Sequence, residues 1–410
     1  MNSLISLKSI NFNLKAVELS STYNLIAYVV LFFVISNRFF SSVYLELNFA
    51  KHLFQNLTSL LALINLIIFV KQRQYYYVNF ALIGVFIGLL VKYFSSSSVI
   101  LFFVSFTLAF SRLNYKYAVY VFIASIFTFT LITFAFFFLE LFDEIIYMMR
   151  DDSIRETFGF RHPNALGATL FFFCLTVWCA CKTHIQNFVA IIINIICILF
   201  LQYCVDSRTA QHVLCLLLFV ALLYEVAKIY KFQEDKIFAN VVVKNLLINS
   251  FFLFSIFFIL LVIFYTPSIN FYSTLNELFS NRLYLCHNAF DKFDLTLFGQ
   301  KLVLSDNDPF HLSSASAVKF MALDPFCISV LFRNGIVSLV FFALCFALIS
   351  KKAITHKEYK IAIALTMISL YGLMENMIAT ISYDIFIFMG MMSFSKVAVN
   401  KTTRIESSGR

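Results

Sequence analysis

The chain has 410 residues, of which 61% are hydrophobic and 13% are charged, and its formal net charge is +9. Soluble domains contain about 45–50% apolar and about 25% charged residues, so this composition excludes an ordinary soluble domain and indicates a helical membrane protein. Nucleic acid is not the expected partner of the positive charge, because the basic residues gather in loops between apolar segments, as membrane orientation requires.

About twelve apolar segments are long enough to cross a bilayer as helices, since backbone groups in hydrocarbon must be hydrogen-bonded within the segment. They lie at 22–40, 53–70, 80–95, 98–111, 117–141, 164–181, 188–204, 212–227, 245–265, 326–350, 361–376 and 382–397. The sequence therefore predicts an all-α polytopic membrane protein that forms a single integral membrane domain over residues 1–410.

The lysine-rich loops alternate between the two sides of the membrane when the N-terminus is placed in the cytoplasm. Most of the 31 Lys and Arg residues then face the cytoplasm, and most of the 22 Asp and Glu residues face outward. We therefore expect cytoplasmic N- and C-termini and an extracytoplasmic insert at 266–324, between the ninth and tenth spans, with short helices of its own. The loop 142–163 and the turn 205–209 fall on the same outer side.

The first polar motif of the outer side precedes the sixth span. It contains Arg155, Arg161 and His162, followed by Pro163 and Asn164. Asparagine is a favoured helix cap, so we expect Asn164 to cap the sixth span. The arginines and the histidine lie beside the membrane surface, where they can bind a substrate or simply extend to the interface as long polar side chains do.

Asp206 and Arg208 belong to the second motif, in the turn before the eighth span. Asp206 or Ser207 can cap that span, and Arg208 falls in its first turn, where the helix dipole disfavours a cation. An arginine in this position suggests a bound anion, and a salt bridge to Asp206 or to another loop is an equal alternative.

The insert contributes Arg282 near its start, His311 in its middle and Asp324 at its end. Arg282 is either a site residue or an ordinary surface arginine of an amphipathic helix. Asp324 precedes Pro325, which is a typical helix start with the aspartate as the cap, and a carboxylate fixed there can also take part in chemistry. Glu375 is an ionisable group near the outer end of the eleventh span and thus a candidate site residue, unless it only pairs with an outer arginine.

Several arginines and one or two carboxylates on one surface suit the transfer of a group from a diphosphate. Arginine forks bind phosphate oxygens and stabilise the charge on a departing pyrophosphate, and a carboxylate can accept the proton of an attacking hydroxyl. No metal site is expected, because the nine cysteines lack ligand spacing and the pair Asp306 and Asp308 has no apolar anchor near the bundle. The arginines would then take the part that a metal plays in other enzymes.

In their order and common sidedness, these motifs resemble the O-antigen polymerase and ligase superfamily, a group of bacterial integral membrane glycosyltransferases. The matching motifs, between Arg155 and Glu375, are HPN at 162–164 with Leu166-Gly167, DSRT at 206–209, Arg282-Leu283, and Asp324 followed by Gly335. The ligase branch of the family carries a histidine at the position of Asp324, so the aspartate favours the polymerase branch.

The resemblance implies an active site on the outer side of the bacterial cytoplasmic (inner) membrane that needs no metal or cofactor. Its donor and acceptor would be undecaprenyl-diphosphate-linked oligosaccharides, and a chain-length regulator protein is a further candidate partner beside the membrane lipid. The protein would be an inverting polymerase of O-antigen, capsular polysaccharide or exopolysaccharide repeat units. Asp324 is the expected base, with His311 as its competitor, and Arg208 and Arg282 would hold the diphosphate. The expected substrate-binding residues are Arg155, Arg161, His162, Asn164, His311 and Glu375.

Two other functions stay open on the sequence. A ligase would transfer finished polymer to another acceptor, and the absence of a histidine at position 324 disfavours it. A flippase or other transporter of lipid-linked oligosaccharides would carry charges within its spans along a central cavity, whereas the middle of these spans is nearly free of charge. For an enzyme, we expect the central part of the insert, 292–312, to form a lid that shapes the choice of acceptor.

Overall fold

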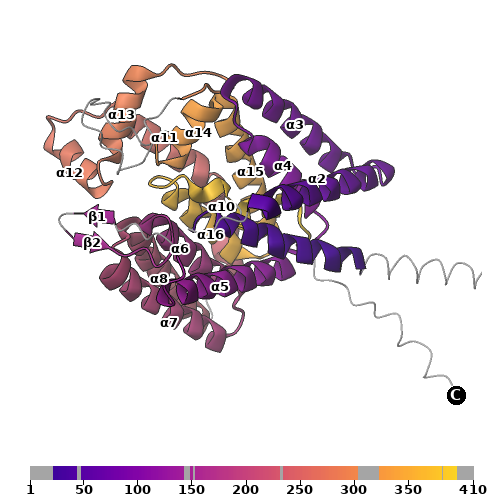
Figure 1. Ribbon diagram of the computed structural model, residues 1–410, viewed down its shortest axis with the longest axis horizontal. Coiled ribbons are helices and arrows are strands. Elements are labelled where there is room, and N and C mark those ends of the chain that lie inside the picture. The colour runs from indigo at the N-terminus through magenta and orange to yellow at the C-terminus, as the bar shows by residue number, and fades with distance from the viewer. Residues whose placement is uncertain are drawn as a thin grey trace, which may run out of the picture.

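The computed structural model describes residues 22–43, 48–142, 148–150, 153–230, 234–302, 323–380 and 382–394. Helices make up nearly all of the regular structure in this part of the chain (Figure 1). Eight of the described helices are long and apolar enough to cross a membrane, or nine if one bent pair counts as a single span. The chain is therefore a multi-pass membrane protein, as its hydropathy pattern predicts.

The described chain begins with the helix Thr22–Phe40. The elements that follow it are α2 (Asn48–Lys71), α3 (Tyr75–Ser95), α4 (Val99–Ala109), α5 (Tyr115–Phe138), the strands β1 (Met148–Arg150) and β2 (Ser153–Arg155), α6 (Pro163–Ala180), α7 (His184–Phe200), the π-helix η1 (Leu201–Val205), α8 (Arg208–Ile229), α9 (Glu234–Ala239), α10 (Val241–Ile248), α11 (Ser250–Ile263), α12 (Asn270–Leu278), α13 (Arg282–Lys292), α14 (Phe326–Asn334), α15 (Ile336–Thr355), α16 (Tyr359–Tyr371), and the 3-10 helices η2 (Met377–Ala379) and η3 (Phe386–Met391). The two strands form a short antiparallel hairpin.

The helices pack in two groups that the C-terminal elements connect. α4 packs against α2 and α3, and α6 packs against α5, α7 and α8. α16 contacts α6 and α8 of the second group, whereas η3 contacts α4 of the first group as well as α15 and α16. Figure 1 shows the first two groups on either side of the C-terminal helices, with α12 and α13 at one end of the molecule. Large apolar side chains such as Phe86, Phe219 and Leu344 are exposed on the outside of the bundle, which is the surface that a bilayer would cover.

Several expected spans have a different form in the structure. The segment at 326–350 is broken at Gly335, so that α15 is its spanning helix and α14 is a separate short helix. The segment at 245–265 is divided into α10 and α11, which meet at 67°. α4 and α16, with 11 and 13 residues, are shorter than a full crossing of about 20 residues. Hydropathy finds such segments but does not report a change in backbone direction within them.

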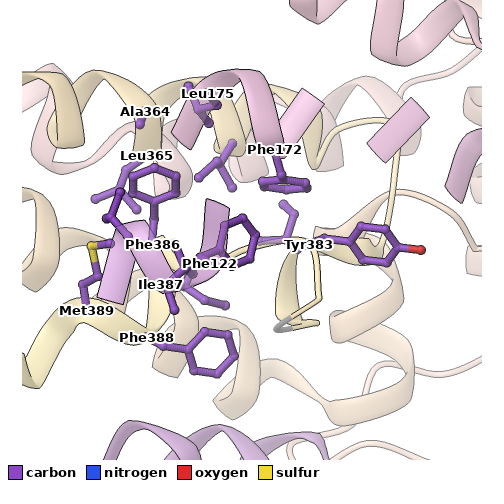
Figure 2. Close-up of a cluster of buried hydrophobic side chains, with 14 of the residues drawn as sticks. Phe122, Phe172, Leu175, Ala364, Leu365, Tyr383, Phe386, Ile387, Phe388 and Met389 are labelled. Atoms are coloured by element: carbon purple, nitrogen blue, oxygen red, sulfur yellow. The ribbon is translucent and has the colours of Figure 1, made fainter. Parts of the chain in front are cut away.

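The C-terminal segment is not the spanning α-helix expected at 382–397. Its described part, 382–394, contains only the six-residue 3-10 helix η3. Phe386, Ile387, Phe388 and Met389 are nevertheless at most 1% exposed, and Figure 2 shows them surrounded by side chains such as Phe122, from α5. The segment is therefore part of the core, although it is too short and irregular to cross lipid by itself.

Lys352, in the last turn of α15, supplies the backbone of this segment with hydrogen bonds. Its Nζ donates to the carbonyl oxygens of Gly390 at 2.9 Å and Met392 at 2.7 Å. At the other end of the segment, the Phe386 amide donates to Asp384 Oδ1 at 2.7 Å. Irregular backbone at membrane depth is tolerated only where protein groups satisfy it, and these contacts meet that condition at both ends of η3.

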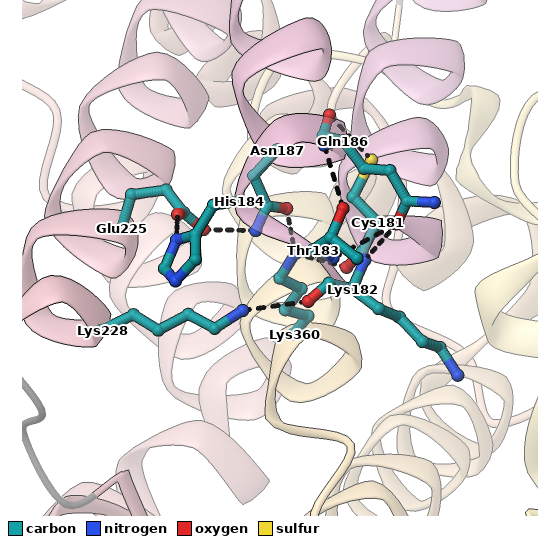
Figure 3. A network of polar contacts seen from close by, with 9 residues as sticks. All are labelled: Cys181, Lys182, Thr183, His184, Gln186, Asn187, Glu225, Lys228 and Lys360. Atoms are coloured by element: carbon teal, nitrogen blue, oxygen red, sulfur yellow. Dashed lines mark hydrogen bonds and ion pairs between the residues drawn. The ribbon is translucent and has the colours of Figure 1, made fainter.

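The two ends of α16 mark two ends of the bundle. Lys360, in the first turn, donates from Nζ to the carbonyl oxygens of Trp178 and Cys181, both at 2.9 Å, and to Asn187 Oδ1 at 2.6 Å. Figure 3 shows the network of polar contacts around Lys360. Glu375 lies just beyond the other end of α16. We name these regions the Lys360 end and the Glu375 end.

The described part of the long insert returns onto the break between α14 and α15. Gly299 and Gly335 have φ angles of +84° and +87°, and a Cβ atom on Gly335 would lie 2.3 Å from the carbonyl oxygen of Leu297. The Ile336 amide donates to the Thr296 carbonyl at 3.0 Å. The close approach of two backbones explains why glycine, which tolerates positive φ, occupies both positions.

Candidate functional site

Glu375 lies at the centre of a polar cluster at the Glu375 end of the bundle. The residue is 3% exposed. Its Oε1 accepts hydrogen bonds from Arg282 Nη2 at 2.8 Å and from Asn164 Nδ2 at 3.0 Å, and the side chain of Thr209 lies near its carboxylate. These partners come from α13, α6 and α8, so the fold brings together polar motifs that are far apart in the sequence.

Arg282, the first residue of α13, bridges two carboxylates. Its Nη2 lies 2.8 Å from Glu375 Oε1 and its Nε lies 3.4 Å from Asp324 Oδ2. Because Arg282 is 7% exposed, it is not an ordinary surface arginine. The expected helix cap at Asp324 is wrong: Pro325 holds the N-cap position of α14, and the Asp324 carboxylate faces Arg282. With 38% of its side chain exposed, Asp324 is the more accessible of the two carboxylates.

Asp206 forms a second ion cluster with two arginines. Arg155, at the end of β2, donates from Nη2 to the Asp206 carbonyl oxygen at 2.8 Å, and its Nε lies 3.9 Å from Asp206 Oδ2. Arg208 Nε lies 3.4 Å from Asp206 Oδ1, so the salt bridge to Asp206 is present. Ser207 takes the N-cap position of α8 without a side-chain cap hydrogen bond. The π-helix η1 immediately before Asp206 is a feature common at functional sites.

The charges of the two clusters are coupled through Glu375. Burial raises the pKa of Glu375 to about 7; Arg282 and Arg155 counteract this effect, whereas Asp324 adds to it. Protonation of Glu375 would remove a negative charge 2.8 Å from Arg282 Nη2 and would make this guanidinium more available to the anionic group of a substrate.

Arg161 and His162 have structural contacts before α6. Arg161 Nε donates to the carbonyl oxygen of Val43 at 3.0 Å and thus ties the loop to the end of the first helix. The Asn164 amide donates to His162 Nδ1 at 3.0 Å, so His162 caps α6 and the expected cap at Asn164 is wrong. The Asn164 side chain binds Glu375 instead of the helix end. Substrate binding by Arg161 and His162 stays a prediction.

Some of the expected residues lie outside the described part of the chain. They include His311, Asp306, Asp308 and most of the expected lid, because residues 303–322 are not described. The choice between Asp324 and His311 as the base therefore stays a prediction. Within the described residues, no group of three or more His, Cys, Asp or Glu side chains is arranged to hold a metal ion.

Thr209 and Tyr383 belong to the site but were not expected there. The side chain of Thr209 lies close enough to Glu375 to lower the pKa of its carboxyl, and the charge of Glu375 raises the pKa of Tyr383. Thr209 ends the DSRT motif, which is the signal that could have identified it. Tyr383 comes from a segment with the composition of an apolar span, so its local sequence gives no such signal.

Comparisons of the chain with protein-family models, with curated proteins and with solved structures found no match. The case for a function therefore rests on the motifs and on the chemistry of the two clusters. Their arginines offer guanidinium forks of the kind that bind phosphate oxygens, and Asp324 is a solvent-accessible carboxylate that can accept a proton.

Proposed function

We propose that the protein is a membrane glycosyltransferase that joins undecaprenyl-diphosphate-linked oligosaccharides into a polysaccharide. The observation that carries this proposal is the convergence of Arg155, Arg208 and Arg282 with Asp324 and Glu375 at one end of a helical bundle. A diphosphate leaving group requires several positive charges, and an attacking sugar hydroxyl requires a nearby base.

In the proposed reaction, a hydroxyl oxygen of the acceptor attacks the anomeric carbon of the donor. The bond between that carbon and the diphosphate oxygen breaks, and the lipid diphosphate leaves with the bonding electrons. Arg208 and Arg282 stabilise the charge on the leaving group, and Asp324 accepts the hydroxyl proton. One displacement inverts the anomeric configuration, so the product has the linkage opposite to that of the donor.

The accessibility of the two carboxylates favours Asp324 over Glu375 as the base. Glu375 is buried and already accepts hydrogen bonds from Arg282 and Asn164. Asp324 is exposed over 38% of its side chain, and its distance of 3.4 Å from Arg282 Nε leaves that contact weak. Glu375 therefore positions Arg282, and Asp324 can move to meet the acceptor.

We further propose that the Glu375 end faces outward and the Lys360 end faces the cytoplasm of a bacterial cell. Lysines 182, 228, 352 and 360 gather at or near the Lys360 end, as expected for the cytoplasmic side. The segment 382–394 would be the last of about twelve crossings, because it leads from Tyr383, which interacts with Glu375, to Met392, which contacts Lys352. Both termini would then be cytoplasmic, and the insert 266–324 would be outside.

The direct test is turnover by the purified protein in nanodiscs, without an ion gradient, on lipid-linked single repeat units. Wild-type protein should produce a ladder of longer chains on a gel, and Asp324→Asn protein of normal stability should not. Repeat units that stay unjoined with wild-type protein contradict the proposal. Transfer of a finished chain to a different acceptor would indicate a ligase, and movement across the membrane without bond formation would indicate a transporter.

A further inference from the structure

A cavity of about 470 Å³ lies beside α14, and its wall includes residues of the insert and of the turn that follows Glu375. Its volume falls within the range of about 300–1,000 Å³ that is usual for small-molecule sites. The polar side chains of its wall are mainly hydroxyls and amides, and they include Ser97, Gln300, Ser329, Arg333, Asn334 and Asn376. Neutral groups that both donate and accept hydrogen bonds suit a ligand rich in hydroxyls.

The wall of this cavity is built from connected backbone and side chains. Asn334 is 5% exposed and donates from Nδ2 to Ser97 Oγ at 2.7 Å, which joins α14 to the turn between α3 and α4. Gly299, next to Gln300, packs against the backbone of Arg333. These contacts fix the cavity in advance, and a preformed site loses less entropy when a ligand binds.

Arg333 is the single charged side chain among the described residues that line the cavity. The structure shows no hydrogen bond or ion pair of its guanidinium with any described residue. Desolvation by the surrounding protein lowers the pKa of Arg333, and the nearby charge of Asp324 raises it. Arg333 is also exposed to solvent, so its guanidinium is accessible to a ligand with a negative group, and a guanidinium binds a carboxylate by a strong double hydrogen bond.

The cavity is close to the proposed base. Asn376, in its wall, directly follows Glu375, and α14, which carries Ser329 and Arg333, begins after Asp324. We propose that this cavity binds a saccharide unit with a carboxylate substituent, such as a uronic acid, with the carboxylate on Arg333 and the ring hydroxyls on the serine and amide side chains. The assignment of this saccharide to the acceptor rests on the proposed polymerase function. The binding of the saccharide in the cavity does not depend on that function.

The test measures the binding of soluble probes to the full-length protein in nanodiscs by saturation-transfer NMR. The probes are methyl glucuronide and methyl glucoside, which differ in one carboxylate. We expect several-fold stronger binding of the glucuronide, loss of this preference in Arg333→Gln protein and partial retention in Arg333→Lys protein. Arg112→Gln is the matched control, because Arg112 lines a different basic cavity, with Lys352 and His356, and it should bind like the wild type.

Equal binding of the two probes, or no binding of either, overturns the proposal. A loss in Arg112→Gln protein also overturns it, since the glucuronide would then occupy the other cavity. Displacement of the glucuronide by inorganic pyrophosphate would identify the cavity as a diphosphate site and would contradict the proposal as well. The thermal unfolding temperature of each variant separates loss of binding from loss of fold. If the glucuronide binds through Arg333 but lipid-linked repeat units are not joined, the polymerase function fails and the saccharide site stands.

Discussion

At the scale of single residues, Glu375 determines how the side chain of Arg282 is arranged. Its Oε1 holds the Nη2 of Arg282, while Asp324 lies near the Nε of the same guanidinium. The hydrogen bond from Nη2 to Glu375 restrains the guanidinium, and preorganised donors are the ones that stabilise a leaving group most. Glu375 is thus a positioning residue whose main effect is on the geometry of Arg282.

The raised pKa of Glu375 predicts how stability depends on pH. The carboxyl titrates near its model value of 4.5 in the unfolded chain and at about 7 in the folded protein. The folded protein therefore holds this proton more tightly, and its free energy of unfolding should fall as pH rises from 4.5 to 7, by up to about 3 kcal/mol. The Glu375→Gln variant lacks this titration, so the difference in thermal unfolding temperature between wild type and variant should change over this range.

The control for this titration is Glu358→Gln. Glu358 pairs with Lys116 at 3.4 Å through a partly exposed side chain, and such pairs contribute about 0–1 kcal/mol. The unfolding temperature of the Glu358→Gln variant should follow that of the wild type across the same pH range. Parallel curves for the wild type and Glu375→Gln would show that burial does not shift the titration of Glu375.

Substitutions of Arg208 and Arg282 should differ in their effect on protein stability but should slow polymerisation to a similar extent. Arg208 has 51% of its side chain exposed, so Arg208→Gln should change the free energy of unfolding by only about 0–1 kcal/mol. Arg282→Gln removes one partner of a buried pair, which costs about 3–5 kcal/mol. Both variants should slow polymerisation by roughly 100-fold or more, because each removes a donor to the leaving group.

Chain growth on lipid-linked repeat units and thermal unfolding in detergent measure these two effects. Arg73→Gln, in the turn between α2 and α3, is the control and should leave both quantities unchanged. Normal chain growth in Arg208→Gln protein would remove Arg208 from the proposed reaction.

At the scale of the elements, the contact between Gly299 and Gly335 fixes the insert to the bundle. Gly335→Ala would place a Cβ 2.3 Å from the Leu297 carbonyl oxygen at a φ of +87°. Strain of this kind costs about 1–3 kcal/mol, and we expect a lower unfolding temperature and slower chain growth. Gly390→Ala is the control, since its nearest neighbour is a side-chain atom of Ile349 at 3.2 Å, and it should be tolerated better. An unchanged unfolding temperature for Gly335→Ala would show that this contact does not hold the insert.

The sequence predicted most of the spanning elements because each is a long apolar run with polar ends. It did not predict the break at Gly335, because the segment that packs on the break, 296–299, is separated from it by the remainder of the insert. It also did not predict the 3-10 helix η3, whose apolar residues have the composition of a spanning α-helix. Its irregular backbone is possible because Lys352, on a different element, donates to Gly390 and Met392.

For the candidate site, the sequence identified the charged residues but not their partners. Arg155, Arg282, Asp324 and Glu375 were singled out by residue type and expected sidedness, and the structure brings them together. The helix caps were wrong because the rules for caps are local. Asn164 is held by Glu375, which is distant in sequence.

At the scale of the whole molecule, the proposed orientation predicts which surfaces reagents can reach. Lys292→Cys, in the insert, should react with a membrane-impermeant maleimide on intact cells, whereas Lys236→Cys, in α9, should react only after the cells are permeabilised. The background carries serine at Cys204 and Cys215, which are exposed. The opposite labelling pattern would reverse the orientation and place the Glu375 end in the cytoplasm.

The buried course of residues 382–394 has a consequence for how the protein is made. A segment whose peptide groups need Lys352 and other helices as partners cannot enter lipid alone. It follows that the bundle must already contain a place for it, and that this segment is inserted after α15 and α16 have assembled. Because Tyr383 leads from this segment to Glu375, the Glu375 end would be completed only when this segment is in place. A chain cut short after residue 380 should therefore fail to join lipid-linked repeat units even when its preceding helices are in the membrane.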